Sequence, residues 1–137
     1  MRITRRGDRS TRRALERMER RIEKKTQRAV NKTVLYIRQV ARAGVPIDTG
    51  YLRESIDITG AGLSKVVSID AEYANFVIYG TGIYNSQGGG RKDGWVYYNE
   101  RWGEFVFTRG QRPNDFWTPA LKLGEAFWKA EIRKIGS

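Results

Sequence analysis

The 137-residue chain contains no cysteine and no histidine. The absence of cysteine excludes disulfide bonds, thiolate metal sites and a cysteine nucleophile. The absence of histidine removes the commonest general base and the commonest metal ligand. No apolar run approaches the roughly 20 residues that span a bilayer, and the arginine-rich start lacks the apolar segment of a signal peptide. We therefore expect a protein without cofactor, metal or membrane contact, made in a reducing cytoplasm.

The positive charge of the chain is concentrated at one end. The sequence has 26 Lys+Arg and 15 Asp+Glu, a net charge of +11. Residues 1–43 hold 15 of the bases and four of the acids, whereas residues 44–137 hold eleven of each. The length is close to the commonest domain size. We expect one domain overall, in which residues 1–43 form a basic helical arm. Residues 44–137 should form a small α+β domain on which the second half of the arm packs.

The arm has the pattern of a long amphipathic helix. Ser10 or Thr11 can cap it, and good helix formers continue to about Ala43, after which Gly44 and Pro46 stop the helix. Residues 1–9 show no apolar periodicity, so we expect them to be flexible unless a partner orders them. Apolar residues then recur at three- and four-residue steps and form a stripe along the helix, which is narrow at first and broad enough to face a core from Val30. These residues are Leu15, Met18, Ile22, Ala29, Val30, Val34, Ile37, Val40 and Ala41.

Such a helix should overhang its own domain. About 33 helical residues span roughly 50 Å, whereas a compact domain of this length is about 35–40 Å across. An overhanging basic helix needs another subunit or a polyanion as its partner. The candidate contacts with a partner protein or with DNA are the cations of its first part: Arg5, Arg6, Arg9, Arg12, Arg13, Arg17, Arg20, Arg21, Lys24, Lys25 and Arg28.

Short elements follow the arm. A short helix containing Leu52, Ser55 and Ile56 should precede a hairpin that begins at Ile58, turns at residues 60–62 and returns to Ile69. Residues 73–79 favour a short helix, with a buried strand as the alternative. An aromatic hairpin is expected over residues 95–98 and 104–108. A final helix, capped by Thr118 with Pro119 in its first turn, should pack on the sheet. The fold class is therefore α+β, with a long N-terminal helix and a small antiparallel sheet built from hairpins.

Residues 83–94 form a glycine-rich loop. No Gly-Lys-Ser/Thr sequence follows the glycines, and no strand-to-helix context surrounds them, so the loop does not resemble a phosphate-binding loop. We expect it to need a neighbour to order it. Its candidate subunit contacts are Gly88, Gly89, Gly90, Arg91 and Lys92.

Asp48-Thr49-Gly50 matches the active-site tripeptide of aspartic proteases. In those enzymes the tripeptide follows an apolar strand, but here it follows a helix stop and leads into a helix start. We interpret Asp48 or Thr49 as a helix cap and Gly50 as a residue that permits close backbone approach. Other acidic pairs, such as Glu100 with Glu104, have no second catalytic signal, and we expect no enzymatic activity.

The rival hypothesis is a basic nucleic-acid-binding protein. The arm has the charge for phosphate contact. Hairpin aromatics could stack on bases: Trp95, Tyr97, Tyr98, Trp102 and Phe105. The arm and the aromatics lie on different segments, however, and no nucleic-acid recognition motif is present.

Three motifs in order resemble the tail-completion or head–tail joining (neck) proteins of long-tailed bacteriophages. They are Val45–Ile56, reading Val-Pro-Ile-Asp-Thr-Gly-Tyr-Leu-Arg-Glu-Ser-Ile, then Tyr73–Thr81, and then Arg112–Ala120. Ile78 stands where the family commonly has glutamate. Asn114-Asp115 replaces a more proline-rich segment before the phenylalanine of the motif. The positions that match the motifs are Pro46, Asp48, Thr49, Gly50, Leu52, Arg53, Ser55, Ile56, Tyr73, Ala74, Gly80, Thr81, Pro113, Phe116, Pro119 and Ala120.

The resemblance covers about Ala29 to Ile135 and implies a structural virion protein at the head–tail junction. It implies a ring, as a homohexamer, whose partners are the head connector or adaptor and the tail tube or tail terminator. DNA passing through the ring could touch the basic arm without sequence preference. Exposed hairpin aromatics would suit subunit contacts.

Overall fold

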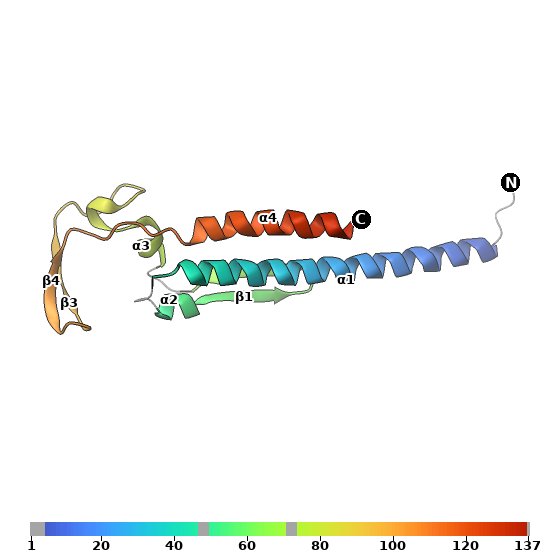
Figure 1. Ribbon diagram of the computed structural model, residues 1–137, viewed down its shortest axis with the longest axis horizontal. Coiled ribbons are helices and arrows are strands. Elements are labelled where there is room, and N and C mark those ends of the chain that lie inside the picture. The colour runs from blue at the N-terminus through green and yellow to red at the C-terminus, as the bar shows by residue number, and fades with distance from the viewer. Residues whose placement is uncertain (1–4, 47–49, 71–73, 137) are drawn as a thin grey trace.

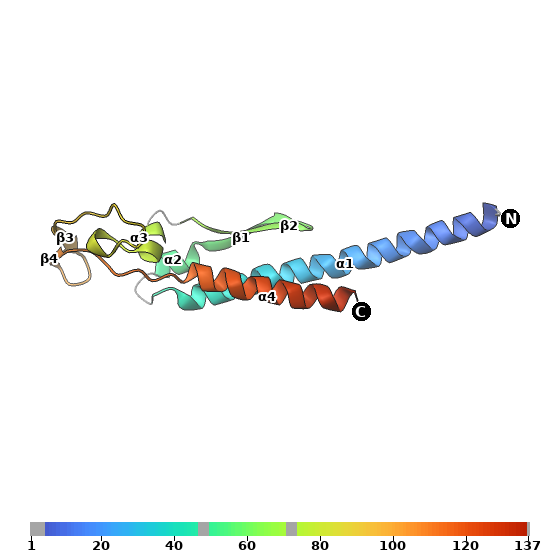
Figure 2. The ribbon, with the colours of Figure 1, turned by 90° about the horizontal axis from the view of Figure 1, so that it is seen from above.

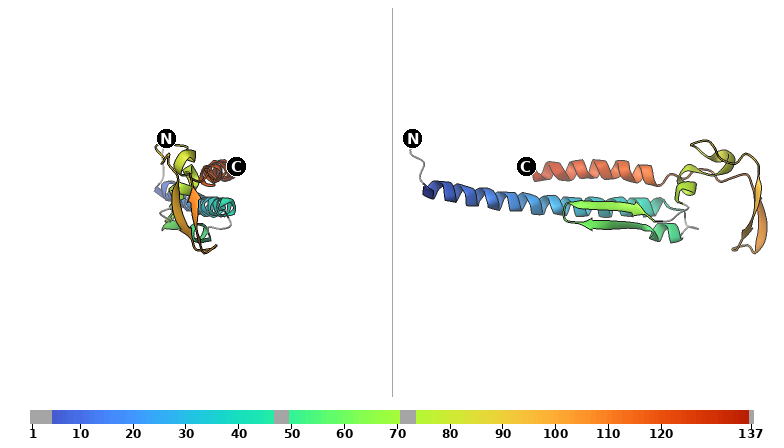
Figure 3. Two further views of the ribbon diagram at one scale, coloured as in Figure 1. Left: turned by 90° about the vertical axis from the view of Figure 1, so that its left-hand side faces the viewer. Right: turned by 180° about the vertical axis from the view of Figure 1, so that it is seen from behind.

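The computed structural model describes residues 5–46, 50–70 and 74–136, with side chains from Arg9 onward. The longest element is helix α1, Arg5–Gly44. Its 40 residues span about 60 Å at 1.5 Å per residue, and the molecule built along it is long and narrow (Figures 1 and 3). The helix begins before the predicted caps. Ser10 and Thr11 lie inside it, so neither is the predicted cap, and the helix includes Gly7 and Asp8, although both are poor helix formers.

Helix α2, Gly50–Glu54, leads into an antiparallel hairpin of β1, Ile56–Ala61, and β2, Ser64–Ile69. The register pairs Ile56 with Ile69 and Ala61 with Ser64. The strand therefore starts two residues earlier than predicted. Ile56 belongs to β1 and not to the preceding helix. The turn is correspondingly shorter, because Gly60 and Ala61 are paired within the strand.

Helix α3, Ala74–Tyr79, confirms the preferred interpretation of that segment. A 3₁₀ turn, η1, Gly82–Tyr84, follows it. The second hairpin consists of β3, Trp95–Asn99, and β4, Glu104–Thr108, with Trp95 opposite Thr108. The hairpins form two separate two-stranded sheets. The predicted α+β class with hairpin-built antiparallel sheets is thus confirmed.

Helix α4, Trp117–Ile135, runs back along α1. It packs on α1, so the predicted packing of this helix on the sheet is wrong. The reason is that α1 lies between α4 and the first hairpin (Figures 1 and 2). The crossing is close at Gly124. A Cβ atom there would lie 2.3 Å from Ile37 Cγ1. Beyond the end of α4 and the tip of the β1–β2 hairpin, the N-terminal part of α1 continues alone (Figure 2).

The hydrophobic core lies where the C-terminal end of α1 meets α2, α3 and the start of α4. Leu52 and Ile56 are its largest fully buried side chains. The other buried members of the core come from α1 and the residue after it, from α3, and from the start of α4 with the residue before it: Ala41, Val45, Ala74, Val77, Ile78, Phe116 and Ala120. The core therefore lies nearer the β3–β4 end of the molecule, and the N-terminal part of α1 projects far from it (Figure 1). In the described part of the chain, no helix is long and apolar enough to cross a membrane.

Candidate interaction surfaces

The motif residues gather in and around this core. Leu52, Ile56, Ala74, Phe116 and Ala120, which come from all three motifs, are buried together there. Ser55 donates a hydrogen bond to the Leu52 carbonyl at 2.7 Å. The proximity of these residues gives the motifs a packing role in this chain.

The second motif also contacts the start of the third motif and the residue before it, Gln111. The Thr81 N–H donates to the Gln111 carbonyl at 2.9 Å, and the Thr81 hydroxyl accepts from the Gln111 N–H at 2.8 Å. Gly80 has a φ of +81°, and a Cβ atom there would lie 2.8 Å from the Gln111 carbonyl oxygen and 2.9 Å from the Pro113 ring. Glycine is thus required at residue 80 both by conformation and by space.

Asp48, Thr49 and Tyr73 lie outside the described residues, so their predicted roles stay predictions. Gly50 begins α2 and is exposed. No described atom lies within 4 Å of a Cβ atom added there, so the expected close backbone approach at this glycine is wrong. Pro119 lies exposed in the first turn of α4. Glu100 and Glu104 are exposed at the β3–β4 turn, and the described residues contain no acidic cluster that could hold a metal ion.

Three polar contacts at the joints of the fold were not predicted. Arg42 Nη2 donates to the Ile56 carbonyl at 2.9 Å, and Arg53 Nη2 donates to the Val45 carbonyl at 3.4 Å. Asp115 Oδ1 accepts from the N–H groups of Trp117 and Thr118 at 3.0 and 2.9 Å, so Asp115 caps α4 in place of the predicted Thr118. Asp115 lies three residues before Thr118, a spacing at which a carboxylate can reach free N–H groups of a first turn.

The cap changes the acidity of Asp115. Partial desolvation raises the pKa of this carboxyl, but hydrogen bonds from the Thr118 side chain and from the Thr118 and Trp117 N–H groups outweigh it. The charge of Lys122 adds to them, and the net effect lowers the pKa below its ordinary value.

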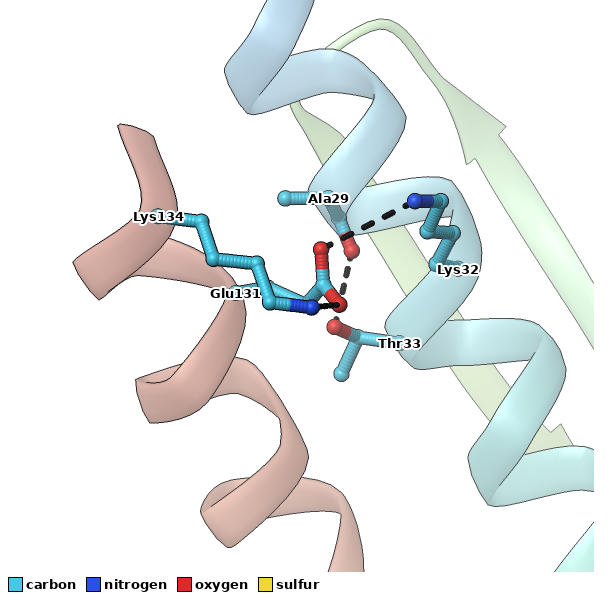
Figure 4. A network of polar contacts seen from close by, with 5 residues as sticks. All are labelled: Ala29, Lys32, Thr33, Glu131 and Lys134. Carbon is cyan, nitrogen blue, oxygen red and sulfur yellow. Dashed lines mark hydrogen bonds and ion pairs between the residues drawn. The ribbon is translucent and has the colours of Figure 1, made fainter. Parts of the chain in front are cut away.

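The C-terminal half of α1 is tied to α4 by a small polar network (Figure 4). Glu131 on α4 lies 3.9 Å from Lys32 Nζ on α1 and 3.2 Å from Lys134 Nζ. The Thr33 hydroxyl donates to the Ala29 carbonyl at 2.7 Å on the same face of α1. The Tyr36 ring stacks on the Phe127 ring with centroids 4.7 Å apart. This half of the helix is therefore an internal packing surface.

The N-terminal half of α1 is open to solvent. Every side chain from residue 9 to residue 25 is exposed, including Leu15 at 53%, Met18 at 55% and Ile22 at 46%. The predicted cations from Arg9 to Lys25 all lie on this stretch, and Arg28 just beyond it is also exposed, whereas the side chains of Arg5 and Arg6 lie outside the described set. Four of the cations surround one surface hollow of about 320 Å³: Arg17, Arg20, Arg21 and Lys24.

The β3–β4 hairpin forms a second open surface at the other end of the molecule (Figure 1). One face carries Val96, Tyr98, Phe105 and Phe107, which are paired across the strands and 53–74% exposed. Tyr98 and Phe105 contact each other edge to face, with centroids 5.2 Å apart. The hairpin packs extensively on no other helix or strand of the described chain.

The glycine loop lies beside this hairpin. Gly88 and Gly89 have a φ of +75° and no described atom near an added Cβ, whereas a Cβ on Gly90 would collide with the Gly82 carbonyl oxygen, 2.1 Å away. Arg91 lies over the Trp95 ring at 6.0 Å, and Lys92 is exposed. Together with α3 the loop borders a pocket of about 460 Å³, whose lining includes Phe76, Gly82, Gly90, Arg91 and Trp95.

Residues 9–80 match the family described as "Bacteriophage HK97-gp10, putative tail-component". This match covers more than half of the chain, and the chain belongs to this family of bacteriophage tail components. The family is a structural one and not an enzyme class, which makes the chain a virion component that works by contacting other virion proteins. No curated protein and no solved structure matches the chain.

The matched residues begin within the basic arm and end with the second motif. The arm is therefore part of what defines the family match, whereas the motif resemblance began only near Ala29. The third motif, the β3–β4 hairpin and α4 lie beyond the match.

Proposed function

We propose that the chain is a neck protein that assembles as a ring, as a homohexamer, and joins the head connector to the tail. The observation that carries this proposal is the β3–β4 hairpin. An isolated two-stranded hairpin is at best marginally stable in water, and a large exposed apolar patch on a soluble protein marks an interaction site. The aromatic face of this hairpin therefore needs a protein partner.

A neighbouring copy in a ring supplies such a partner. In a closed ring, each subunit contacts the next through two different surfaces, so the hairpin of one copy packs on another part of its neighbour. The glycine loop and its pocket lie next to the hairpin and would form part of the same contact. The head connector or adaptor and the tail tube or tail terminator would then bind the two faces of the ring. This role requires no catalytic activity.

Substitution of Phe105 tests the ring contact. The Phe105 side chain is 74% exposed, so Phe105→Ser should leave the folded monomer almost unchanged in stability while shifting the subunits from ring to monomer. Val66→Ser on the first hairpin is a matched control, because Val66 is 54% exposed and lies away from the aromatic face. Native mass spectrometry measures the assembly. A Phe105→Ser protein that forms rings as well as the wild type would exclude the hairpin as the contact.

The location of the chain is tested on assembled particles. Electron microscopy of purified virions with a gold-labelled antibody against this chain should place the label between head and tail. Label found only along the tail shaft or at the tail tip would overturn the neck role while keeping the chain a tail component.

A second candidate function, nonspecific nucleic-acid binding, is favoured by the cations around the arm hollow. If it holds, affinity for duplex DNA should fall steeply with salt, because bound counterions are released. The charge-neutralised variant Arg17→Gln/Arg20→Gln/Arg21→Gln/Lys24→Gln should then flatten the salt dependence. A wild-type protein that does not bind DNA at 50 mM salt would remove this candidate.

A further inference from the structure

The turn of the β3–β4 hairpin holds a tryptophan out into solvent. Trp102 is 64% exposed, and its ring contacts no other ring in the part of the chain that the structure describes. Its backbone is fixed, because Asn99 Oδ1 accepts from the N–H groups of Arg101 and Trp102 at 3.0 and 3.2 Å, and the Asn99 carbonyl accepts from the Gly103 N–H at 2.7 Å. A well-defined turn thus presents a large apolar side chain of a type enriched at the centre of protein interfaces.

The pocket at the base of the same hairpin can receive such a side chain. It measures about 460 Å³ and is open to the surface. Its walls include the rings of Phe76 on α3 and Trp95 on β3, together with Gly89 and Gly90 of the loop. Because glycines bring no side chain into the space, a flat aromatic ring can lie against the backbone there and next to the aromatic walls.

Trp102 cannot reach the pocket of its own chain. A strand rises about 3.4 Å per residue, so Trp95 and Asn99 at the two ends of β3 lie about 14 Å apart. Pairing with β4 keeps β3 extended, and Figure 1 shows both strands leading away from α3 toward the turn. A turn that fills this pocket must therefore come from a second copy.

We infer that Trp102 of each copy inserts into this pocket of the next copy around the ring. The inference rests on the proposed ring and names the two surfaces that meet in it. Turn and pocket are different surfaces, as a head-to-tail contact in a closed ring requires. Phe105, which follows the turn on β4, extends the same contact along the neighbour.

The charges of the turn and of the loop beside the pocket are opposite. Residues 99–104 contain two acids and one base, whereas residues 91–93 contain two bases and one acid. Neither Glu100 nor Glu104 forms an ion pair within the described residues. The opposite charges orient the contact, while burial of the indole supplies most of its stability. The same two acids repel phosphate, which makes DNA a poor partner for Trp102.

This contact leaves room for DNA in a ring of six. Equivalent points of neighbouring copies are separated by the distance from pocket to turn within one copy, about 20 Å when the turn and the indole are added to β3. Because neighbours in a ring are not shifted along its axis, the hairpins lie across the axis, and for six copies the circle through such points has a radius equal to their spacing. The hairpin occupies about 5 Å on the inner side of this circle, so an opening about 30 Å wide remains, wider than a DNA duplex.

Cross-linking through introduced cysteines tests the contact, because the native chain has none. In the variant Glu100→Cys/Lys92→Cys one thiol lies beside Trp102 and the other beside the pocket, and Trp102 itself is kept. A bifunctional maleimide shorter than β3 cannot join the two thiols of one chain. It should join neighbours and give a ladder on a denaturing gel up to the full subunit number. The matched control, Glu100→Cys/Lys122→Cys, places the second thiol at an exposed lysine of α4 and should give no ladder.

Mixing the single variants tests the head-to-tail direction. Chains with Glu100→Cys and chains with Lys92→Cys, assembled together, should yield cross-linked dimers, and either variant alone should yield none. Dimers from Glu100→Cys alone would mean that two turns meet each other, which would overturn the insertion.

Removal of the indole gives the second measurement. Trp102→Ala, added to the Glu100→Cys/Lys92→Cys protein, should lower the cross-linked fraction about tenfold or more, as expected for a tryptophan at the centre of an interface. Leu63→Ala, at the turn of the first hairpin and 51% exposed, should leave it unchanged. Native mass spectrometry reports the ring separately. A ring without cross-links between turn and pocket, or a cross-linked fraction that Trp102→Ala does not change, overturns the insertion and leaves the proposed function standing. The absence of any ring in the wild type overturns both.

Discussion

Replacement of Gly124 by alanine tests the close packing of α4 on α1. The new Cβ atom would lie 2.3 Å from Ile37 Cγ1 and 2.6 Å from Ile37 Cδ1, far inside van der Waals contact. Either Ile37 leaves its side-chain position or the helices separate. Overpacking of this kind costs about 1–3 kcal/mol. Alanine in place of glycine within a helix contributes about 1 kcal/mol in the opposite direction. We expect Gly124→Ala to lower the free energy of unfolding by about 0–2 kcal/mol in urea titration.

The collision is isolated from other effects by a double-mutant cycle with Ile37→Ala, which removes both atoms that the new Cβ meets. The double variant should be more stable than the sum of the single changes predicts, by about 1 kcal/mol or more. Ala126→Gly, on the exposed side of α4, measures helix propensity in the same helix without the contact. A Gly124→Ala protein that is stabilised by the full propensity difference, with no coupling to Ile37, would refute the close crossing.

Three further predictions concern the polar contacts of α4. Asp115→Ala should lower the free energy of unfolding by about 1 kcal/mol through loss of the helix cap, whereas Asp115→Asn should keep most of the capping stabilisation. Urea titration at pH 7 measures both variants. Equal losses in the two variants would contradict capping. Because the pKa of Asp115 is lowered in the folded chain, its ionic stabilisation is complete above the ordinary aspartate value of about 3.9 and is lost as the pH falls through the lowered value. Asp115→Asn should therefore flatten the acid limb of a plot of unfolding free energy against pH. An unchanged acid limb would exclude the Asp115 carboxylate as a source of the pH dependence. Glu131→Gln should lower the free energy of unfolding by about 1 kcal/mol or less, because it removes the ion pairs with Lys32 and Lys134. The loss should be smaller in 1 M salt. A loss that does not depend on salt would point to packing instead.

Local patterns predicted most elements of the fold. Apolar spacing identified the long helix, and turn residues with alternating aromatics identified the β3–β4 hairpin with its strands in place. Boundaries were less predictable. Ser10 is a good capping residue, yet the helix starts at Arg5 and runs through Gly7 and Asp8. Propensity does not explain this start, because both residues are poor helix formers.

Tertiary contacts set the features that the sequence could not reveal. Arg42 and Arg53 are ordinary arginines in their local patterns, and only the folded chain brings them to the carbonyls of Ile56 and Val45. The position of α4 had a local signal. Ala120 and Gly124 are small residues four apart, which permits a close helix–helix approach. That spacing does not identify the partner, and the packing of α4 on α1 instead of a sheet followed only from the structure.

The two open ends of the molecule differ in chemistry, and this difference bears on which of them can bring free subunits together. The β3–β4 face is apolar, so its burial is driven by the hydrophobic effect and does not weaken with added salt. The arm is exposed and carries the excess positive charge of the chain, so the arms of free subunits repel one another, and added salt screens this repulsion. The hairpin contact is therefore the one that can form between free subunits, and added salt should favour the proposed ring.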